Sequence, residues 1–180
     1  GGASGKPAAG TRMGDEVLMA PGLDVQDNGN YLRAFWHNVL IVVWKKVEDG
    51  AIPKVVADLE TLDRRSVGVI YLSVIPDIEE PPSPDFFRKM GQAISAQSRV
   101  RRFLAIAVVF EATELRSSVA RITFNTVNMV VPGTFPKKGV NSIAEATRVV
   151  APFLRATDGR AVTAQELEAA VQQLRGQGQA

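Results

Sequence analysis

The chain contains no cysteine and only one histidine, His37. Because disulfides, thiolate zinc sites, iron–sulfur clusters and cysteine nucleophiles all require cysteine, the sequence excludes each of them. A single histidine also excludes a metal site built from several histidines, and a Ser-His-Asp device would depend on that one residue. We therefore expect a protein that is not an enzyme and that uses neither a cofactor nor a metal.

Long hydrophobic runs and a large excess of one charge are also missing. The longest apolar run, Phe103 to Phe110, is much shorter than the stretch of about 18 residues that spans a membrane. No apolar stretch of the kind found in a secretory signal occurs near the N-terminus. With 21 Lys+Arg against 19 Asp+Glu, the formal net charge is +2. We expect a cytoplasmic protein with no membrane partner, and nucleic acid is a disfavoured partner.

What the chain does have is enough apolar material for one folded domain, since 46% of its 180 residues are hydrophobic. Composition divides it into three parts. Residues 1–30 are rich in Gly, Ala, Pro and Asp, which predicts a flexible N-terminal segment. Residues 31–156 carry the regular apolar patterns of an α/β domain, and residues 157–180 follow as a C-terminal helix and a polar tail.

Apolar runs alternate with helical periods along the domain. The runs predict strands at Tyr31–Trp36, Leu40–Val43, Val67–Ile75, Phe103–Phe110 and Lys137–Val140. Helices are predicted to begin near Asp49, Ser83, Thr113, Ser142 and Thr163. Helices that connect successive buried strands imply that these strands pair in parallel. The first two strands form a hairpin, which adds an antiparallel pair. The predicted fold is α/β, a single-layer, mixed but mostly parallel sheet of four or five strands with four helices plus a C-terminal helix.

This order of elements resembles the STAS domain, the fold of bacterial anti-sigma factor antagonists. The resemblance covers roughly Tyr31 to Leu154 and includes the short last strand that leads into SIAEATRVVAPFL. It implies a regulatory or scaffolding module in the bacterial cytosol that docks onto partner proteins. In the best-known members a Ser or Thr at the start of the second helix, within an Asp-Ser-(Ser/Thr)-Gly type motif, is the site of a phosphorylation switch.

The corresponding segment here, VIPDIEEPPSPDFFRKM, departs from that motif. Asp77 stands near the expected position, but no Ser-Gly follows it, and Ser83 is the hydroxyl that remains near the helix start. Because Pro84 follows directly, Ser83 is expected to cap the helix. A phosphate there would also be repelled by the nearby carboxylates. We therefore expect a module without the usual serine phosphoswitch.

Acidic residues in the same loop provide an alternative function. Asp77, Glu79 and Glu80 follow a predicted strand at its carboxyl end, where open α/β sheets place their ligands. An enzyme, or a binder of a small ligand or cation, could use the loop Asp77–Glu80. A solvated acidic loop is the simpler interpretation.

A long uncharged segment suggests a partner-binding surface. No charged residue occurs across the fifteen positions from Ile122 to Pro136, whereas a surface helix on a sheet usually carries charge on its outer face. The predicted partner-binding residues are Phe124, Asn125, Asn128 and Phe135 from this segment, with Asp77 and Ser83 from the acidic loop. A homo-oligomer built by this segment, and its coverage by the C-terminal helix, are both open alternatives.

Basic residues cluster before two of the buried strands. Arg64-Arg65 precedes one, and Arg99, Arg101 and Arg102 precede the next. Basic side chains favour helix C-termini, so both clusters are predicted at the same end of the sheet, where they could form a weak anion-binding face. His37, in the predicted hairpin turn, is expected to be an exposed residue without a catalytic role.

Overall fold

The computed structural model describes residues 23–66, 68–78, 80, 82–98, 102–112 and 134–178. Its strands are β1 (Asp24–Asp27), β2 (Tyr31–Trp36), β3 (Val39–Trp44), β4 (Val69–Ile75), β5 (Phe103–Phe110) and β6 (Lys137–Val140). Its α-helices are α2 (Ile52–Arg65), α3 (Pro84–Ser98), α5 (Ile143–Val150) and α6 (Ala164–Gly178), and the short 3-10 helices are η2 (Asp49–Ala51) and η3 (Ala151–Phe153). Within these ranges the protein is of the α/β class.

All the described strands form one sheet, in the order β1-β2-β3-β4-β5-β6. The pairs β1–β2 and β2–β3 are antiparallel, and the remaining pairs are parallel. Helix α2 connects β3 to β4, and α3 lies between β4 and β5 along the chain. The predicted α/β class with a mixed, mostly parallel sheet is therefore confirmed.

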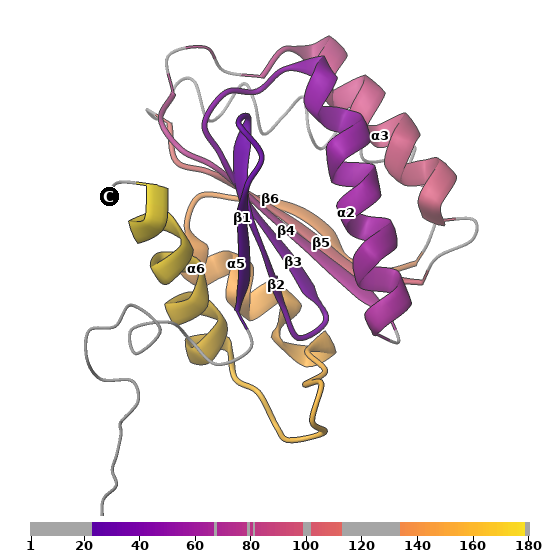
Figure 1. Ribbon diagram of the computed structural model, residues 1–180, viewed down its shortest axis with the longest axis vertical. Coiled ribbons are helices and arrows are strands. Elements are labelled where there is room, and N and C mark those ends of the chain that lie inside the picture. The colour runs from indigo at the N-terminus through magenta and orange to yellow at the C-terminus, as the bar shows by residue number, and fades with distance from the viewer. Residues whose placement is uncertain are drawn as a thin grey trace, which may run out of the picture.

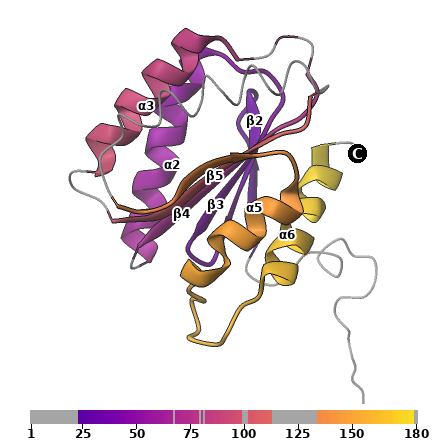
Figure 2. The same ribbon diagram turned by 180° about the vertical axis from the view of Figure 1, so that it is seen from behind.

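Helices cover the sheet on both sides. Helices α2 and α3 lie on one side, and α5 and α6 lie on the other (Figures 1 and 2). Alternate residues of β3 divide between the two cores: Leu40 and Val42 pack toward α2 and α3, whereas Val39 and Ile41 pack toward α5 and α6. Because both faces are buried, the exposed surfaces that a partner could reach on the sheet are its edges and connecting loops.

The helix starts follow the local chemistry that the sequence predicts. The N–H of Glu145 donates to the Ser142 hydroxyl oxygen at 3.1 Å. Thr163 and Glu166 form both halves of a capping box, at 3.1 Å from the Glu166 N–H to the threonine hydroxyl and 3.0 Å from the Thr163 N–H to the glutamate carboxylate. The predicted capping box at α6 is confirmed. At α5 the Ser142 half is present, but the Glu145 carboxylate accepts the N–H of Asn141 at 3.3 Å, one residue before the cap.

Within the described residues the sheet has six strands, so it is larger than the predicted four or five. The additional strand, β1, falls inside the segment of residues 1–30 that was predicted to be flexible, so that boundary is wrong by at least the length of this strand. Strand β1 pairs with β2 from Asp24 opposite Phe35 to Asp27 opposite Leu32. Its sequence DVQD lacks a strand-like apolar pattern, because it is an edge strand with most of its side chains exposed.

Helix α6 belongs to the core. Leu167, Val171 and Leu174 are fully buried and pack in the same cluster as α5 and one face of the sheet. The predicted helix from Thr113 lies outside the described residues. Within the ranges given above, no helix combines the length and the apolar character that crossing a bilayer requires.

Candidate anion-binding site

A hollow of about 480 Å³ lies at the amino edge of the sheet, where the parallel strands β4 and β5 begin. Its described lining consists of Arg64, Arg65, Ser66, Arg102, Leu104, Arg155, Ala156 and Thr157. We refer to it as the arginine hollow. Its four arginines come from the end of α2, the start of β5 and the segment after η3, so the fold brings together charges that are far apart in the sequence.

The turn from α2 into β4 forms one wall. Helix α2 ends at Arg65, and the hydroxyl of Ser66 donates to the carbonyl oxygens of Leu62 at 3.1 Å and of Gly68 at 3.2 Å. Gly68 has a φ of +89°, and a Cβ atom there would lie 2.7 Å from a methyl carbon of Leu104. Position 68 therefore requires glycine for two reasons: its φ is positive, and Leu104 leaves no room for a Cβ atom.

Two residues of the β2–β3 turn hold the opposite wall. The side-chain amide of Asn38, which is fully buried, donates to the Phe153 carbonyl at 3.1 Å and accepts from the Arg155 N–H at 2.9 Å. The Thr157 N–H donates to Nδ1 of His37 at 3.1 Å. These bonds fix the backbone of Arg155 and Thr157 at the rim of the arginine hollow.

His37 is buried, with 9% of its surface exposed, so the expectation of an exposed turn histidine is wrong. Because Nδ1 accepts the Thr157 N–H, a neutral ring carries its proton on Nε2. Burial lowers the pKa of His37, and Arg160 adds to that effect, while Asp158 and Glu166 oppose it. A neutral histidine can be buried at such a turn, and its φ of +53° is one that histidine adopts more readily than most residues.

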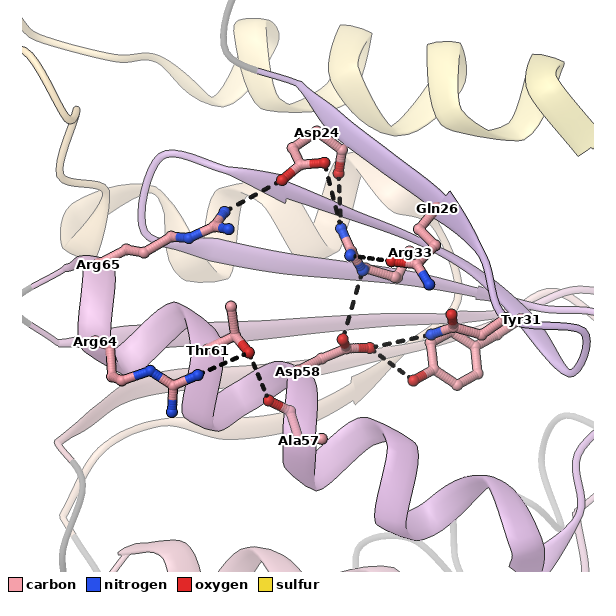
Figure 3. A network of polar contacts seen from close by, with 10 residues as sticks. Asp24, Gln26, Tyr31, Arg33, Ala57, Asp58, Thr61, Arg64 and Arg65 are labelled. Atoms are coloured by element: carbon pink, nitrogen blue, oxygen red, sulfur yellow. Dashed lines mark hydrogen bonds and ion pairs between the residues drawn. The ribbon is translucent and has the colours of Figure 1, made fainter.

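One arginine of the hollow has a carboxylate partner. Arg65 Nη1 lies 3.2 Å from Asp24 Oδ2, and its guanidinium group lies over the Phe35 ring at 4.8 Å from the ring centroid. Figure 3 shows Asp24 between the guanidinium groups of Arg65 and Arg33. The charge of Arg65 is therefore partly compensated within the chain.

Two other arginines of the hollow contact neutral groups. Arg64 donates to the hydroxyl of Thr61 at 3.3 Å, and Arg155 donates to the Leu154 carbonyl at 3.0 Å. Among the residues that the structure describes, no carboxylate forms an ion pair with Arg64, Arg102 or Arg155. The arginine hollow thus carries excess positive charge, and guanidinium groups match carboxylate and phosphoryl oxygens in geometry.

A buried polar network lies next to the hollow (Figure 3). Arg33, which is 8% exposed, lies 3.6 Å from Asp24 Oδ1 through Nη1 and 3.4 Å from Asp58 Oδ1 through Nε. The Tyr31 hydroxyl donates to Asp58 Oδ2 at 2.7 Å. Burial raises the pKa of Asp58, although its contacts with Tyr31 and Arg33 act to lower it. Strand β1 is therefore tied through Asp24 both to this network and to Arg65.

None of the predicted partner-binding residues that the structure describes lines the arginine hollow. Phe124, Asn125 and Asn128 fall outside the described residues. Phe135 is half-buried against the core, and its ring stacks on Phe103 with 5.8 Å between the ring centroids. Contacts within the chain therefore cover part of the Phe135 ring, which reduces the ring surface that a partner could contact.

The acidic loop is at the opposite, carboxyl edge of the sheet. The Ser83 hydroxyl accepts the Phe86 N–H at 3.1 Å, so its predicted role as a helix cap is confirmed. Asp77 and Glu80 are exposed after β4, and Glu79 is outside the described residues. In the part of the chain that the structure describes, no group of three or more acidic or histidine side chains is arranged to hold a metal ion.

The sequence indicated only part of the arginine hollow. Arg64, Arg65 and Arg102 were predicted at one end of the sheet, and the structure brings them together there. The contributions of Arg155 and Asn38 were missed. Their contact joins residues 117 positions apart, and no local pattern signals it.

These observations define an α/β domain whose sheet is covered on both faces and whose amino edge carries a basic hollow. The chain matches no protein-family model, no curated protein and no solved structure.

Proposed function

We propose that this protein is a non-enzymatic, STAS-like interaction module that binds an acidic segment of a partner protein in the arginine hollow. The observation that carries the proposal is the excess of guanidinium groups around a hollow of about 480 Å³. The setting we propose is a bacterial cytosolic regulatory or scaffolding assembly.

The arrangement of the fold supports a module that works at its edges. The described elements between Tyr31 and Leu154 follow the order that the resemblance to STAS domains leads one to expect. Helices cover both faces of the sheet (Figures 1 and 2), which leaves edges and loops for a partner. Ser83 already caps α3, and this supports a module that lacks the usual serine phosphoswitch.

The chemistry of the hollow favours an acidic protein segment over nucleic acid. Arginine binds carboxylates with paired N–H donors, and side chains such as Arg65, which is 52% exposed, can be reached from solvent. The described lining contains no aromatic side chain on which a nucleobase could stack. Carboxylates of the partner would balance the charge of Arg64, Arg102 and Arg155, which have no ion-pair partner among the described residues.

A direct test is the titration of an oligoglutamate peptide into the wild-type protein and into two charge-reversal variants. Arg102→Glu changes the hollow, and Lys46→Glu makes the same charge change at the carboxyl edge, where Lys46 pairs with Glu48 at 3.1 Å. We expect the wild type to bind the peptide with an affinity that falls as salt is added. Arg102→Glu should weaken binding about tenfold, because an attraction becomes a repulsion. Lys46→Glu should leave binding nearly unchanged.

Four results would contradict this function. Equal weakening by both variants would show attraction by overall charge alone. Tighter binding of a single-stranded oligonucleotide than of the peptide would favour nucleic acid, and binding of inorganic phosphate without any binding of the peptide would favour a small anion. If the wild type self-associates and Arg102→Glu does not, the arginine hollow binds a second copy of the chain instead of an acidic partner.

A further inference from the structure

Asp24 contacts the arginine hollow from the edge strand β1. Its Oδ2 atom lies 3.2 Å from Arg65, and its Oδ1 atom lies 3.6 Å from Arg33. The pair with Arg65 is open to solvent, since both side chains are 52% exposed, whereas the Arg33 side chain is 10% exposed. An incoming carboxylate can therefore reach Arg65 while Asp24 is bound to it.

Few apolar contacts hold β1 in place. Val25 and the preceding Leu23 are half-buried against the core, while Asp24, Gln26 and Asp27 are exposed. At its other end the strand is tied by Asp27, whose carboxylate lies 2.8 Å from Lys45. In addition to the pairing with β2, the ion pairs of the Asp24 side chain with Arg65 and Arg33 hold the end of β1 that borders the hollow.

We propose that Asp24 is an internal competitor for the anion and that binding in the arginine hollow displaces it and loosens β1. This inference rests on the proposed function, because it concerns the regulation of the same site. Two carboxylates on one guanidinium group repel each other, so occupancy by a ligand favours the state in which Asp24 has moved away. Arg33 retains Asp58 at 3.4 Å, so this movement does not leave a buried guanidinium group without a carboxylate.

Linkage makes the effect reciprocal: if binding loosens β1, then loosening β1 strengthens binding by the same factor. Asp24→Asn removes the competing charge, and Asp27→Asn is its matched control, with the same charge change on the same strand but at the pair with Lys45. For the oligoglutamate peptide we expect Asp24→Asn to raise the affinity about threefold. Asp27→Asn should leave the affinity within error of the wild type.

A second measurement uses the wild-type protein, so it does not depend on how a variant folds. Amide hydrogen exchange of residues Asp24–Asp27 should become faster when the peptide saturates the hollow, whereas exchange in β3 and β4 should not. If the peptide binds through Arg102 but exchange in β1 is unchanged and the Asp24 and Asp27 variants bind equally, the competitor role is wrong and the proposed function stands. If the peptide binds to neither the wild type nor the variants, both fail.

Discussion

The two ends of the sheet differ in how their charges are compensated. At the carboxyl edge, charged side chains form ion pairs within the chain, as in Asp27–Lys45 at 2.8 Å, Asp49–Lys89 at 2.6 Å and Glu111–Arg175 at 2.6 Å. At the amino edge, four arginines surround a hollow, and among the described residues Asp24 is the carboxylate that forms an ion pair with one of them. Binding of an anion therefore depends less on the total number of charged side chains at an edge than on the number that lack an ion-pair partner.

The backbone differs between the two edges as well. Gly29 near the carboxyl edge and Gly68 at the amino edge both have positive φ, at +84° and +89°. A Cβ atom on Gly29 would meet nothing within 4 Å, whereas one on Gly68 would lie 2.7 Å from Leu104. At Gly68 the backbone of the amino edge therefore packs closely against Leu104, which lines the arginine hollow.

Replacing Asn38 should produce the largest change in stability. Asn38→Ala leaves the Phe153 carbonyl and the Arg155 N–H without their partner in a buried place. We expect the free energy of unfolding in urea to fall by about 3 kcal/mol. The same change at Asn30, whose side chain bonds in an exposed loop at the carboxyl edge, should cost less than about 1 kcal/mol.

Asn38→Ala should also weaken binding of the oligoglutamate peptide, because Arg155 is no longer held at the rim. Equal destabilisation by the Asn38 and Asn30 variants would contradict the claim that the amino edge is the more closely fitted one.

Alanine at the two left-handed glycines should separate backbone strain from the close contact. Gly29→Ala introduces only an unfavourable φ, and we expect it to cost about 1 kcal/mol. Gly68→Ala adds the contact with Leu104 and should cost about 2 kcal/mol. Urea unfolding of both variants measures the difference, and equal costs would show that Leu104 moves aside freely.

Acid should weaken the amino edge through His37. The folded state holds the pKa of His37 below its ordinary value of 6.5, mainly because the ring is buried. The unfolded chain therefore takes up the proton first, and stability is complete above pH 6.5 and is lost as the pH falls through the lowered value. Protonation of Nδ1 would also remove the bond from the Thr157 N–H.

Unfolding of the wild type and of His37→Asn, measured between about pH 5 and pH 7, tests this dependence, because asparagine tolerates the turn's positive φ. The variant should show a flatter dependence on pH. The acidic groups with lowered pKa values, such as Asp85 and Glu166, change their charge below this range, since their ordinary values are 3.8 and 4.5. The same slope in both proteins would exclude His37 as its cause.

Local patterns predicted most of the fold. The capping residues Ser142 and Thr163 mark the starts of α5 and α6, and the apolar runs mark strands that are buried on both faces. Strand β1 was missed because its polar sequence is stabilised by pairing with β2 and by ion pairs from Arg33 and Arg65. These contacts join residues that are far apart in the sequence, so a local sequence pattern cannot predict them.

The candidate site was predictable only in part. Arg64, Arg65 and Arg102 precede strands, so their common edge follows from parallel topology. The place of Arg155 depends on a turn residue more than a hundred positions away. His37 was expected to be exposed because polar turn residues usually are, but a backbone N–H satisfies its Nδ1 atom and lets the neutral ring be buried.

The proposed function requires that the amino edge, and not the carboxyl edge, binds the anionic partner. Chemical-shift changes of the backbone amides during titration with the oligoglutamate peptide test it most directly. We predict that the largest changes fall at residues 64–66, 102–104 and 155–157, with smaller ones in β1. Changes centred on Asp77, Ser83 and the start of α3, or spread evenly over the surface, would contradict it.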